Sequence, residues 1–340
     1  MKFGFQLMLR GVASSPEGLT AVVQKGEQSG FDIVAPNDHI LVPAGIDSTY
    51  PYSENGVWAG ASVVDCHDQL TALTFIAGKT ERIKILTSVM VVPYREPVLT
   101  AKIISSADVL SKGRIIVGCG AGWMQEEMDA IGAPPFRERG KVTDEYLSIF
   151  KELWTKEDPA YDGEYAKFKN IHFKPKPVQK PHPPIWIGGE SKAALRRTAR
   201  LGNGWFPAAN NPKFRIDSPD SLKDRLDTLR QLCDEEKRDF AELDLGFFYT
   251  GVVSSDPVTG EDQKRRIFSG KPEDIIGDIE SFRDVGLGTI IFRMERPSLM
   301  ETLDLLEWFG SEVKPLFKNC LLYTSPSPRD QRGSGLAACG

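Results

Sequence analysis

The order of strand-like and helix-like segments along the 340 residues predicts an α/β protein with a (β/α)8 TIM barrel. Two observations support this prediction. Eight short apolar runs alternate with segments of helical periodicity, and glycines at Gly30, Gly202 and Gly286 each end a helix-like segment directly before a strand. Glycine adopts the left-handed conformation that closes a helix, so these positions indicate repeated helix-to-strand joints.

Hydrophobic periodicity gives the expected elements in order. The strands are expected at Lys2–Leu7, Phe31–Ala35, Ile83–Val89, Arg114–Gly118, Pro184–Gly188, Gly204–Pro207, Asp244–Thr250 and Thr289–Arg293. The helices are expected at Pro16–Ser29, Leu70–Gly78, Pro97–Leu110, Lys141–Trp154, Ser191–Leu201, Pro219–Glu235, Pro272–Val285 and Ser298–Phe309. Asp65 or Asp68 is a natural N-cap for the second helix. The barrel domain is therefore expected to cover residues 1–317.

Two segments interrupt the alternation and are expected as excursions after strands 2 and 4. Val42–Gly60 is rich in Pro, Gly, Ser, Asn and Tyr, and Glu157–Pro184 includes a proline-lysine run. Long loops at the rim of a barrel usually carry substrate contacts, so we expect both segments to shape the pocket. Residues 318–340 have no apolar period and many breakers, and we exclude them as a disordered tail of non-native character.

The composition restricts the class of protein. Apolar residues make up 41% of the chain, and the formal charge of −5 provides no basic field for nucleic acid or an anionic membrane. No apolar run reaches the roughly 18 residues of a membrane span, and the N-terminus has no signal-peptide pattern. We therefore expect a cytoplasmic protein with no nucleic-acid or membrane partner. The five dispersed cysteines lack a C-x-x-C pair, which predicts free thiols.

The most informative stretch is Arg114–Trp123, where a strand-like run breaks into alternating glycines. Its G-x-G-x-G spacing differs from the dinucleotide-binding pattern G-x-G-x-x-G. Glycines after a strand let a flat or anionic ligand approach backbone amides, and the alternative is a tight turn without a ligand. The candidate cofactor-binding residues in this stretch are Gly118, Cys119, Gly120, Ala121, Gly122 and Trp123.

Asp38 and His39 follow the second expected strand and are the candidate catalytic pair. An imidazole titrates near neutral pH, and a carboxylate beside it sets its charge and tautomer. The alternative is a loop-capping aspartate next to an interfacial histidine. None of the four histidines stands in a metal-ligand pattern, so we predict no metal site.

The sequence contains no G-x-S-x-G, G-x-x-x-x-G-K-[ST] or H-E-x-x-H motif, which favours chemistry carried out by a cofactor. Pro184–Ser191 runs from a strand into a helix. The amides of Gly188, Gly189, Glu190 and Ser191 therefore lie at a helix N-terminus suited to phosphate. The alternative is a serine-capped turn, which the acidic Glu190 favours.

Together these motifs resemble the luciferase-like monooxygenase superfamily, and most closely its coenzyme F420 (deazaflavin)-dependent oxidoreductase branch, over residues 1–317. The motifs that carry the resemblance are Gly30-Phe31-Asp32 with Asn37-Asp38-His39, Thr80–Ile83 with Thr87-Ser88-Val89, Arg95–Leu99 with Ala101-Lys102, Leu110–Trp123 and Ile187–Ser191. The resemblance implies a non-prolyl cis peptide at Ser88–Val89 against an isoalloxazine-like ring. It also implies that residues 118–123 contact the cofactor and that residues 188–191 bind its phosphate.

The reaction that the resemblance implies is hydride transfer between a bound deazaflavin and a small organic substrate. His39 would position the ring or handle a proton, Asp38 would orient His39, and Trp58 and Trp123 would form aromatic walls. The resemblance also leaves open an FMN-dependent two-component monooxygenase fed by a separate reductase. A non-catalytic flavin-binding protein and a metal-dependent barrel hydrolase are further alternatives.

Other properties are open at this stage. A separate cofactor reductase is an expected partner, and a homodimer is common in the family. Gln69 and Glu96 depart from the residues usual in the family, which leaves the substrate unidentified. Arg293, at the end of the last expected strand, either meets an anionic group of the substrate or cofactor or forms a surface salt bridge.

Overall fold

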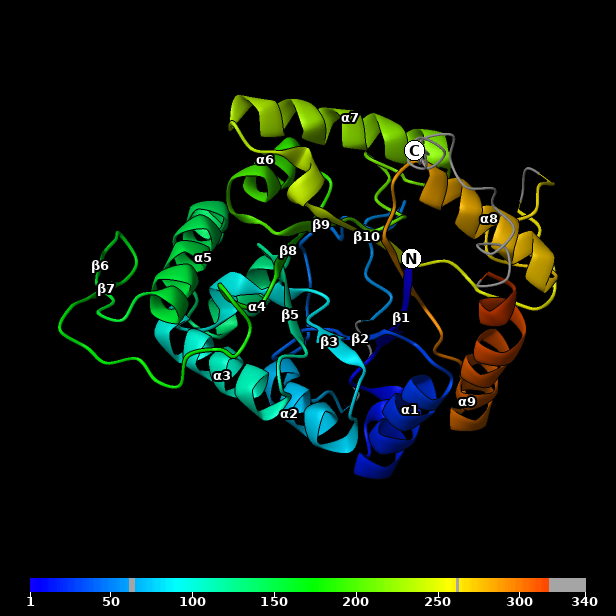
Figure 1. Ribbon diagram of the computed structural model, residues 1–340, viewed down its shortest axis with the longest axis horizontal. Coiled ribbons are helices and arrows are strands. Elements are labelled where there is room, and N and C mark those ends of the chain that lie inside the picture. The colour runs from blue at the N-terminus through cyan, green and yellow to red at the C-terminus, as the bar shows by residue number, and fades with distance from the viewer. Residues whose placement is uncertain (61–64, 261–262, 318–340) are drawn as a thin grey trace, which may run out of the picture.

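The computed structural model describes residues 1–60, 65–260 and 263–317, and it confirms the predicted (β/α)8 barrel (Figure 1). Parallel strands form a sheet in the order β3-β2-β1-β11-β10-β9-β8-β5, which closes because β3 also pairs with β5. The barrel strands are β1 (Lys2–Leu7), β2 (Ile33–Pro36), β3 (Lys84–Leu86), β5 (Ile115–Gly120), β8 (Ile185–Gly188), β9 (Gly204–Phe206), β10 (Asp244–Tyr249) and β11 (Thr289–Phe292). A short strand, β4 (Met90–Val91), adds to the end of β5.

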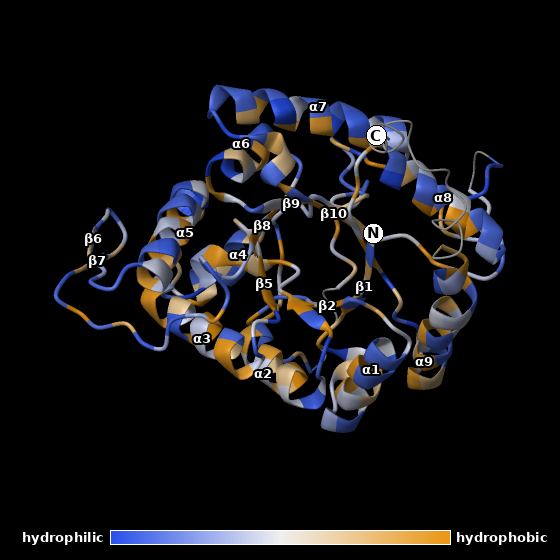
Figure 2. Ribbon diagram, viewed as in Figure 1, coloured by the Kyte–Doolittle hydropathy of each residue, from blue (hydrophilic) through white to orange (hydrophobic). Residues whose placement is uncertain are grey.

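Helices surround the barrel in Figure 1, and the short helix at Gln125–Ala130 lies inside their ring. They are α1 (Pro16–Gln28), α2 (Gln69–Lys79), α3 (Pro97–Leu110), α4 (Gln125–Ala130), α5 (Arg139–Thr155), α6 (Lys192–Leu201), α7 (Pro219–Glu235), α8 (Pro272–Asp284) and α9 (Leu299–Trp308). Short 3-10 turns lie at Gly11–Ala13, Val92–Tyr94, Phe136–Glu138 and Phe240–Glu242, and a π-helical turn lies at Phe309–Val313. The helices carry mixed apolar and polar surfaces, as expected for elements that pack on a barrel on one side only (Figure 2).

The core has two layers because side chains alternate along each strand. One layer fills the barrel interior and consists of Ile33, Ala35, Leu86, Ile116, Trp186, Phe206 and Ile291. The larger layer lies between the strands and the helices and includes Phe3, Phe5 and Leu7 of β1. Each such fully buried side chain contributes roughly 1.5–3 kcal/mol. The interior layer closes the barrel below the carboxyl ends of the strands.

The two long segments begin at opposite ends of the barrel. Residues 42–60 follow β2 and therefore extend from the carboxyl ends of the strands. Residues 157–184 follow α5 and lead into β8, so both ends of the segment lie on the amino-terminal side, where Gln179 donates to the carbonyl of Ile115 at the start of β5 (2.7 Å). The middle of the segment runs back along α5, where the Tyr165 hydroxyl donates to Glu138 at 3.1 Å. In this segment β6 (Tyr161–Asp162) and β7 (Lys167–Phe168) form a hairpin that projects from the side of the barrel (Figure 1).

The expectation that residues 157–184 extend from a barrel strand and shape the pocket is wrong. The connection from β5 to β8 passes through α5, and a helix in this fold returns the chain to the amino-terminal end before the next strand begins. None of the described residues of this segment lines the central cavity. The predicted excursion after β2, by contrast, contributes Tyr50, Tyr52 and Trp58 to that cavity.

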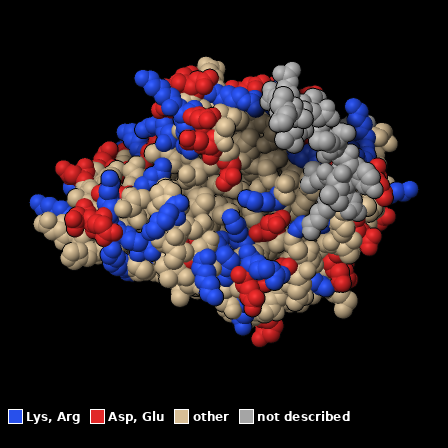
Figure 3. Space-filling view, in the orientation of Figure 1, with Lys and Arg blue, Asp and Glu red and all other residues tan. Residues whose placement is uncertain are grey.

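The described part of the chain ends at Phe317, whose ring packs edge-on against Phe3 at 5.3 Å. The tail predicted at residues 318–340 lies outside the described residues. On the face shown in Figure 3, basic and acidic side chains are interspersed. Within the described ranges, no helix has both the length and the apolar content needed to cross a membrane.

Candidate functional site

A cavity of about 560 Å³ lies at the carboxyl ends of the barrel strands, the end at which TIM barrels form ligand sites. Alternation along β1 turns Gln6 toward this cavity, while Leu7 packs in the outer core layer. Most of the residues predicted for the site line the cavity. They are Asp38, His39, Ser88, Val89, Gly120, Ala121, Gly122, Trp123, Gly188, Gly189 and Ser191.

His39 is held by a carboxylate from α4. Its Nδ1 lies 2.9 Å from Oε2 of Glu127, and the Tyr94 hydroxyl donates to the same oxygen at 2.7 Å. The amides of Ile40 and Leu41 donate to the other oxygen, at 2.7 and 3.2 Å. Because a carboxylate only accepts, Nδ1 carries the proton, and Nε2 is the nitrogen left for a ligand.

The charge on Glu127 depends on these bonds. Its side chain is fully buried. Burial raises its pKa, but the hydrogen bonds from His39, Tyr94 and Ile40 outweigh burial and hold the pKa below its ordinary value. Burial and the adjacent carboxylate raise the pKa of Tyr94. At neutral pH the site therefore contains a buried, charged carboxylate with its donors fixed around it.

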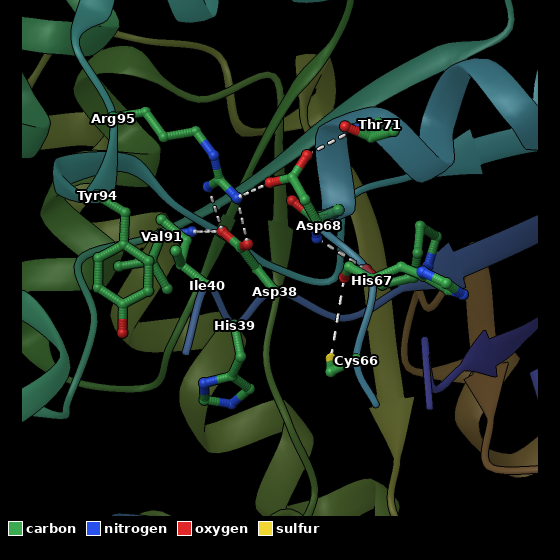
Figure 4. A network of polar contacts seen from close by, with 12 residues as sticks. Asp38, His39, Ile40, Cys66, His67, Asp68, Thr71, Val91, Tyr94 and Arg95 are labelled. Carbon is green, nitrogen blue, oxygen red and sulfur yellow. Dashed lines mark hydrogen bonds and ion pairs between the residues drawn. The ribbon is translucent and has the colours of Figure 1, made fainter. Parts of the chain in front are cut away.

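Asp38 does not orient His39, and that prediction is wrong (Figure 4). Its carboxylate accepts two bonds from the Arg95 guanidinium, at 2.9 and 2.8 Å, and one from the amide of Val91 at 2.9 Å. Consecutive residues in extended backbone point in opposite directions, so Asp38 and His39 reach different partners. Asp38 ties the chain after β2 to the segment that precedes α3.

Arg95 also joins a third element to this cluster. It donates to Asp68 at 2.6 Å, and Asp68 caps α2 by accepting from the Thr71 amide at 2.7 Å (Figure 4). This cap was one of the two predicted from the sequence. Burial lowers the pKa of Arg95, but Asp38 and Asp68 together raise it above the ordinary value. The cluster is thus a charged clamp behind one cavity wall.

Aromatic rings cover the cavity beside His39. Trp58 lies 4.5 Å from the His39 ring, measured between centroids, and 5.8 Å from Trp123. Tyr50 meets Trp123 at 4.9 Å, edge to face. Segment 42–60 therefore supplies rings that lie over the catalytic candidate, in agreement with the aromatic walls expected from Trp58 and Trp123.

The glycines of β5 and the turn after it have different roles. A Cβ atom on Gly118 would lie 2.0 Å from the Thr87 carbonyl oxygen, and one on Gly120 would lie 2.7 Å from Val89. Gly122 has a φ of +84°, which favours glycine. The Ser88–Val89 peptide bond is cis, as the resemblance implied. Gly120 and Gly122 line the cavity, whereas Gly118 lies deeper in the barrel beside Leu86.

Cys119 lies outside the cavity, behind the wall that β5 forms. Its side chain is buried in the outer core layer, and burial raises the pKa of its thiol. Neither Cys119 nor Gly118 lines the cavity. The prediction of Cys119 as a direct cofactor contact is wrong because alternation turns its side chain to the outer layer, and Gly118 faces the barrel interior beside Leu86, deeper than the cavity. The residues of β5 and its turn that do line the cavity are Gly120, Ala121, Gly122 and Trp123.

The turn after β8 begins α6. Gly188, Gly189 and Ser191 line the cavity, and Ser191 caps the helix by accepting from the Ala194 amide at 3.2 Å. The serine-capped turn is therefore confirmed, and phosphate binding by the amides of this turn stays a prediction.

Glu190 is the exception in this turn. Its carboxylate is buried away from the cavity and accepts from the Ala208 amide and the Asn211 side chain, both at 2.7 Å. Burial raises its pKa despite these bonds. The Glu190 side chain is therefore not available to a ligand, and only its backbone amide remains a candidate for binding a phosphate.

Sequence reasoning missed the arginines at this end of the cavity. Arg137, Arg139 and Arg197 line it next to the start of α6. Arg139 donates to the Gly122 carbonyl at 3.2 Å, and Arg197 pairs with Asp144. These arginines lie on or just before α5 and on α6 with no motif spacing, so no local signal marks them. They make this end of the cavity basic.

Residues 1–286 match the family described as luciferase-like monooxygenase, and the chain belongs to that family. The chain is therefore a luciferase-like oxidoreductase or monooxygenase. An uncharacterized protein of Mycobacterium tuberculosis is 32% identical over 212 residues, which are 62% of this chain and 74% of that protein. An FMNH(2)-dependent dimethylsulfone monooxygenase of Pseudomonas putida is 30% identical over 183 residues, which are 53% of this chain and 48% of that enzyme.

Solved structures share the fold at low sequence identity. The coenzyme F420-dependent tetrahydromethanopterin reductase of Methanopyrus kandleri has a TM-score of 0.73 and 17% identity, covering 93% of this chain and 99% of that one. An F420-dependent secondary alcohol dehydrogenase in complex with an F420-acetone adduct has a TM-score of 0.72 and 16% identity, covering 93% of this chain and 98% of that one. At these identities the likeness extends to the fold alone.

Proposed function

We propose that the protein is a coenzyme F420-dependent oxidoreductase, which transfers a hydride between a bound deazaflavin and a small organic substrate. The observation that carries this proposal is His39 in the cavity, with its Nδ1 fixed on Glu127 at 2.9 Å and its ring 4.5 Å from Trp58. This arrangement suits proton handling beside a flat redox cofactor.

The residues of the cavity fit such a cofactor. Gly120 and Gly188 present bare backbone around Val89, and a Cβ on Gly188 would approach Val89 to 3.0 Å, so this wall accepts a flat ring that side chains would exclude. The amides at the start of α6 and the neighbouring arginines suit a phosphate. The volume of about 560 Å³ lies within the range of cofactor sites.

A bound deazaflavin supplies or accepts the hydride. The chain's own contribution begins at His39, whose Nε2 takes a proton from a substrate hydroxyl, or returns it in the reverse direction. The charged Glu127 stabilises the imidazole while it holds that proton, and its bonds to Tyr94 and Ile40 keep it in place. Trp58 and Trp123 exclude water from this side of the cavity.

A second candidate is an FMN-dependent two-component monooxygenase fed by a separate reductase. The observation that favours it is the 30% identity to the FMNH(2)-dependent dimethylsulfone monooxygenase. The same bare wall and basic end suit FMN as well, so the cavity alone does not rank the two cofactors. The Glu127-held His39 suits proton transfer coupled to hydride transfer, which is why we place the deazaflavin first.

The deciding experiment titrates the purified protein with coenzyme F420 and with FMN, each oxidised and reduced, side by side. We expect saturable binding of the deazaflavin and no oxygen uptake with it. Tight binding of FMN with oxygen uptake on reduction, and no binding of the deazaflavin, would overturn the proposal in favour of the second candidate. Stoichiometric binding without turnover of any substrate offered would favour a flavin-binding protein.

The role of His39 is tested separately. We expect His39→Ala to lower turnover by about 10²–10⁴-fold while cofactor affinity changes little, because the bare wall and phosphate end are intact. The matched control is His172→Ala, which removes an exposed histidine from segment 157–184. Equal turnover in His39→Ala and in wild type would exclude the proposed role.

A further inference from the structure

The cavity has two unlike halves. The half next to β5 and β8 is lined by Gly120 and Gly188, and the half next to β1 and β10 is lined by the larger side chains of Gln6, Phe248 and Thr250. If the flat cofactor occupies the bare half, as in the proposed function, the substrate occupies the other. The chemistry of that second half therefore reports on the substrate.

Arg293 stands at the rim of the second half. In β11, Ile291 lies in the barrel interior and Phe292 in the outer core layer. Alternation then turns Arg293, the next residue, back toward the barrel axis. The register of β11 with β1 and β10 brings Arg293 level with Gln6 and Thr250, which both line the cavity.

The guanidinium of Arg293 is exposed at this rim. Within residues 1–60, 65–260 and 263–317 it forms no hydrogen bond or ion pair. The neighbouring arginines Arg296 and Arg10, by contrast, use their guanidinium groups in hydrogen bonds. Arg296 donates to the backbone carbonyls of Val253 and Glu295, and Arg10 donates to the Gly60 carbonyl at 2.8 Å. Arg293 is thus the rim arginine whose donors are all available.

The electrostatics of the rim favour an anion. Arg10 and Arg293 act on the same two groups, Tyr50 and Glu295. Burial raises the pKa of Glu295, and the two arginines act in the opposite direction. Two cations therefore act on Tyr50, a residue that lines the cavity, which favours an anion at this rim.

Below these charges one wall of the half-cavity is apolar. Met8, Phe248 and Trp58 line it. The Arg10 guanidinium lies 5.8 Å from the centroid of the Trp58 ring. The centroids of the Trp58 and His39 rings are 4.5 Å apart. A molecule that extends from the rim to His39 therefore passes along an apolar wall, with positive charge at its outer end.

We propose that the substrate is a small organic acid, with its oxyanion bound by Arg293, Arg10 as the second positive charge, and its apolar body against Trp58 and Met8. The proposal rests on the proposed function only in assigning the bare half of the cavity to the cofactor. Arg293 is suited to this task because a guanidinium binds carboxylate, sulfonate or phosphate through two parallel hydrogen bonds.

The test uses the cofactor-free protein and follows tryptophan fluorescence, since Trp58 and Trp123 line the cavity. The probes are benzoate and benzenesulfonate, each compared with neutral benzamide at constant ionic strength. The variants are Arg293→Gln and, as matched control, Arg200→Gln, which removes the same charge from an exposed position in the last turn of α6. Thermal unfolding of both variants checks that they are folded.

We expect wild type to bind at least one of the acids about tenfold more tightly than benzamide. Arg293→Gln should remove that preference and leave benzamide unchanged, Arg293→Lys should retain part of it, and Arg200→Gln should match wild type. Equal binding of acids and amide by wild type would overturn the proposal. Acid binding that survives in Arg293→Gln would also overturn it, by placing the anion at the α6 end. Because no cofactor is present, failure of the deazaflavin assignment would not affect this result.

Discussion

Segments 42–60 and 157–184 are alike in composition, but they differ in whether they contribute to the cavity. Both contain prolines, glycines and tyrosines, and each is tied down by a glutamate whose carboxylate accepts consecutive backbone amides. Glu126 holds the amides of Asp47 and Ser48, both at 2.8 Å. Glu145 holds the amides of residues 164–166 at 2.8–2.9 Å. Only the first segment lines the cavity.

The difference comes from the element that precedes each segment. A chain that leaves a barrel strand emerges at the carboxyl-terminal face, and a chain that leaves a helix emerges at the opposite face. Composition and length carry no information about which face is reached. A loop in this fold is therefore best judged by its neighbours in the chain, and substitution of the glutamates that hold each segment tests whether the contrast extends to function.

Among the substitutions of these glutamates, the largest effect is expected from Glu127→Gln. Its carboxylate bonds both His39 and the amide of Ile40, just before segment 42–60. Loss of a positioning carboxylate typically costs about 10–100-fold in activity, and we expect that loss in kcat with a smaller change in KM. The measurement is steady-state turnover. The matched control is Glu145→Gln, for which turnover within about twofold of wild type is expected. A comparable loss in both variants would remove the functional contrast.

A smaller effect is expected from Glu126→Gln. The neutral amide weakens two charge-assisted bonds to segment 42–60, so we expect KM to rise by a few-fold, with kcat nearly unchanged. Hydrogen exchange should become faster at Asp47 and Ser48. Glu145→Gln should speed exchange at residues 164–166 to a similar degree without changing KM. An unchanged KM in Glu126→Gln would mean that the anchoring of the segment does not affect substrate binding.

The smallest effect concerns stability against pH. The pKa of Glu127 is lowered in the folded protein, so its carboxylate stabilises the fold at pH values above the unfolded-state pKa of about 4.3. That contribution is lost as the pH falls through the lower, folded-state value. Denaturant unfolding of Glu127→Gln should therefore show a smaller loss of stability than wild type on acidification from pH 5 to 3. Parallel curves would contradict the assignment of a lowered pKa.

The barrel was predictable because its elements are periodic and clearly bounded. Strand β1 and helices α3 and α7 match the expected residues at both ends. The missed elements include the six-residue helix α4 and the two-residue strands β4, β6 and β7, which are too short to show a period. Prediction of individual elements therefore fails where the local signal is shorter than one or two turns, and the placement of segment 157–184 fails because composition does not say which end of the barrel a loop leaves.

The site was predictable in its positions but not in its pairings. Motifs at strand ends located His39, Ser88 and Gly120 at one cavity. The partner of His39 is 88 residues away along the chain, and adjacency in sequence wrongly suggested Asp38. Side-chain direction at the end of a strand depends on backbone details that composition does not carry. Pairings of this kind require coordinates.

The glycines of β5 bear on how this pocket can change during evolution or engineering. A Cβ atom on Gly118 would collide with the Thr87 carbonyl, and one on Gly120 would collide with Val89. Gly122 has a backbone conformation that favours glycine. Substitution there alters the barrel wall itself. Segment 42–60 presents its rings from outside the barrel strands. New substrate preferences should therefore arise by exchange of Tyr50, Tyr52 and Trp58, and mutant libraries are best directed to that segment while β5 is kept constant.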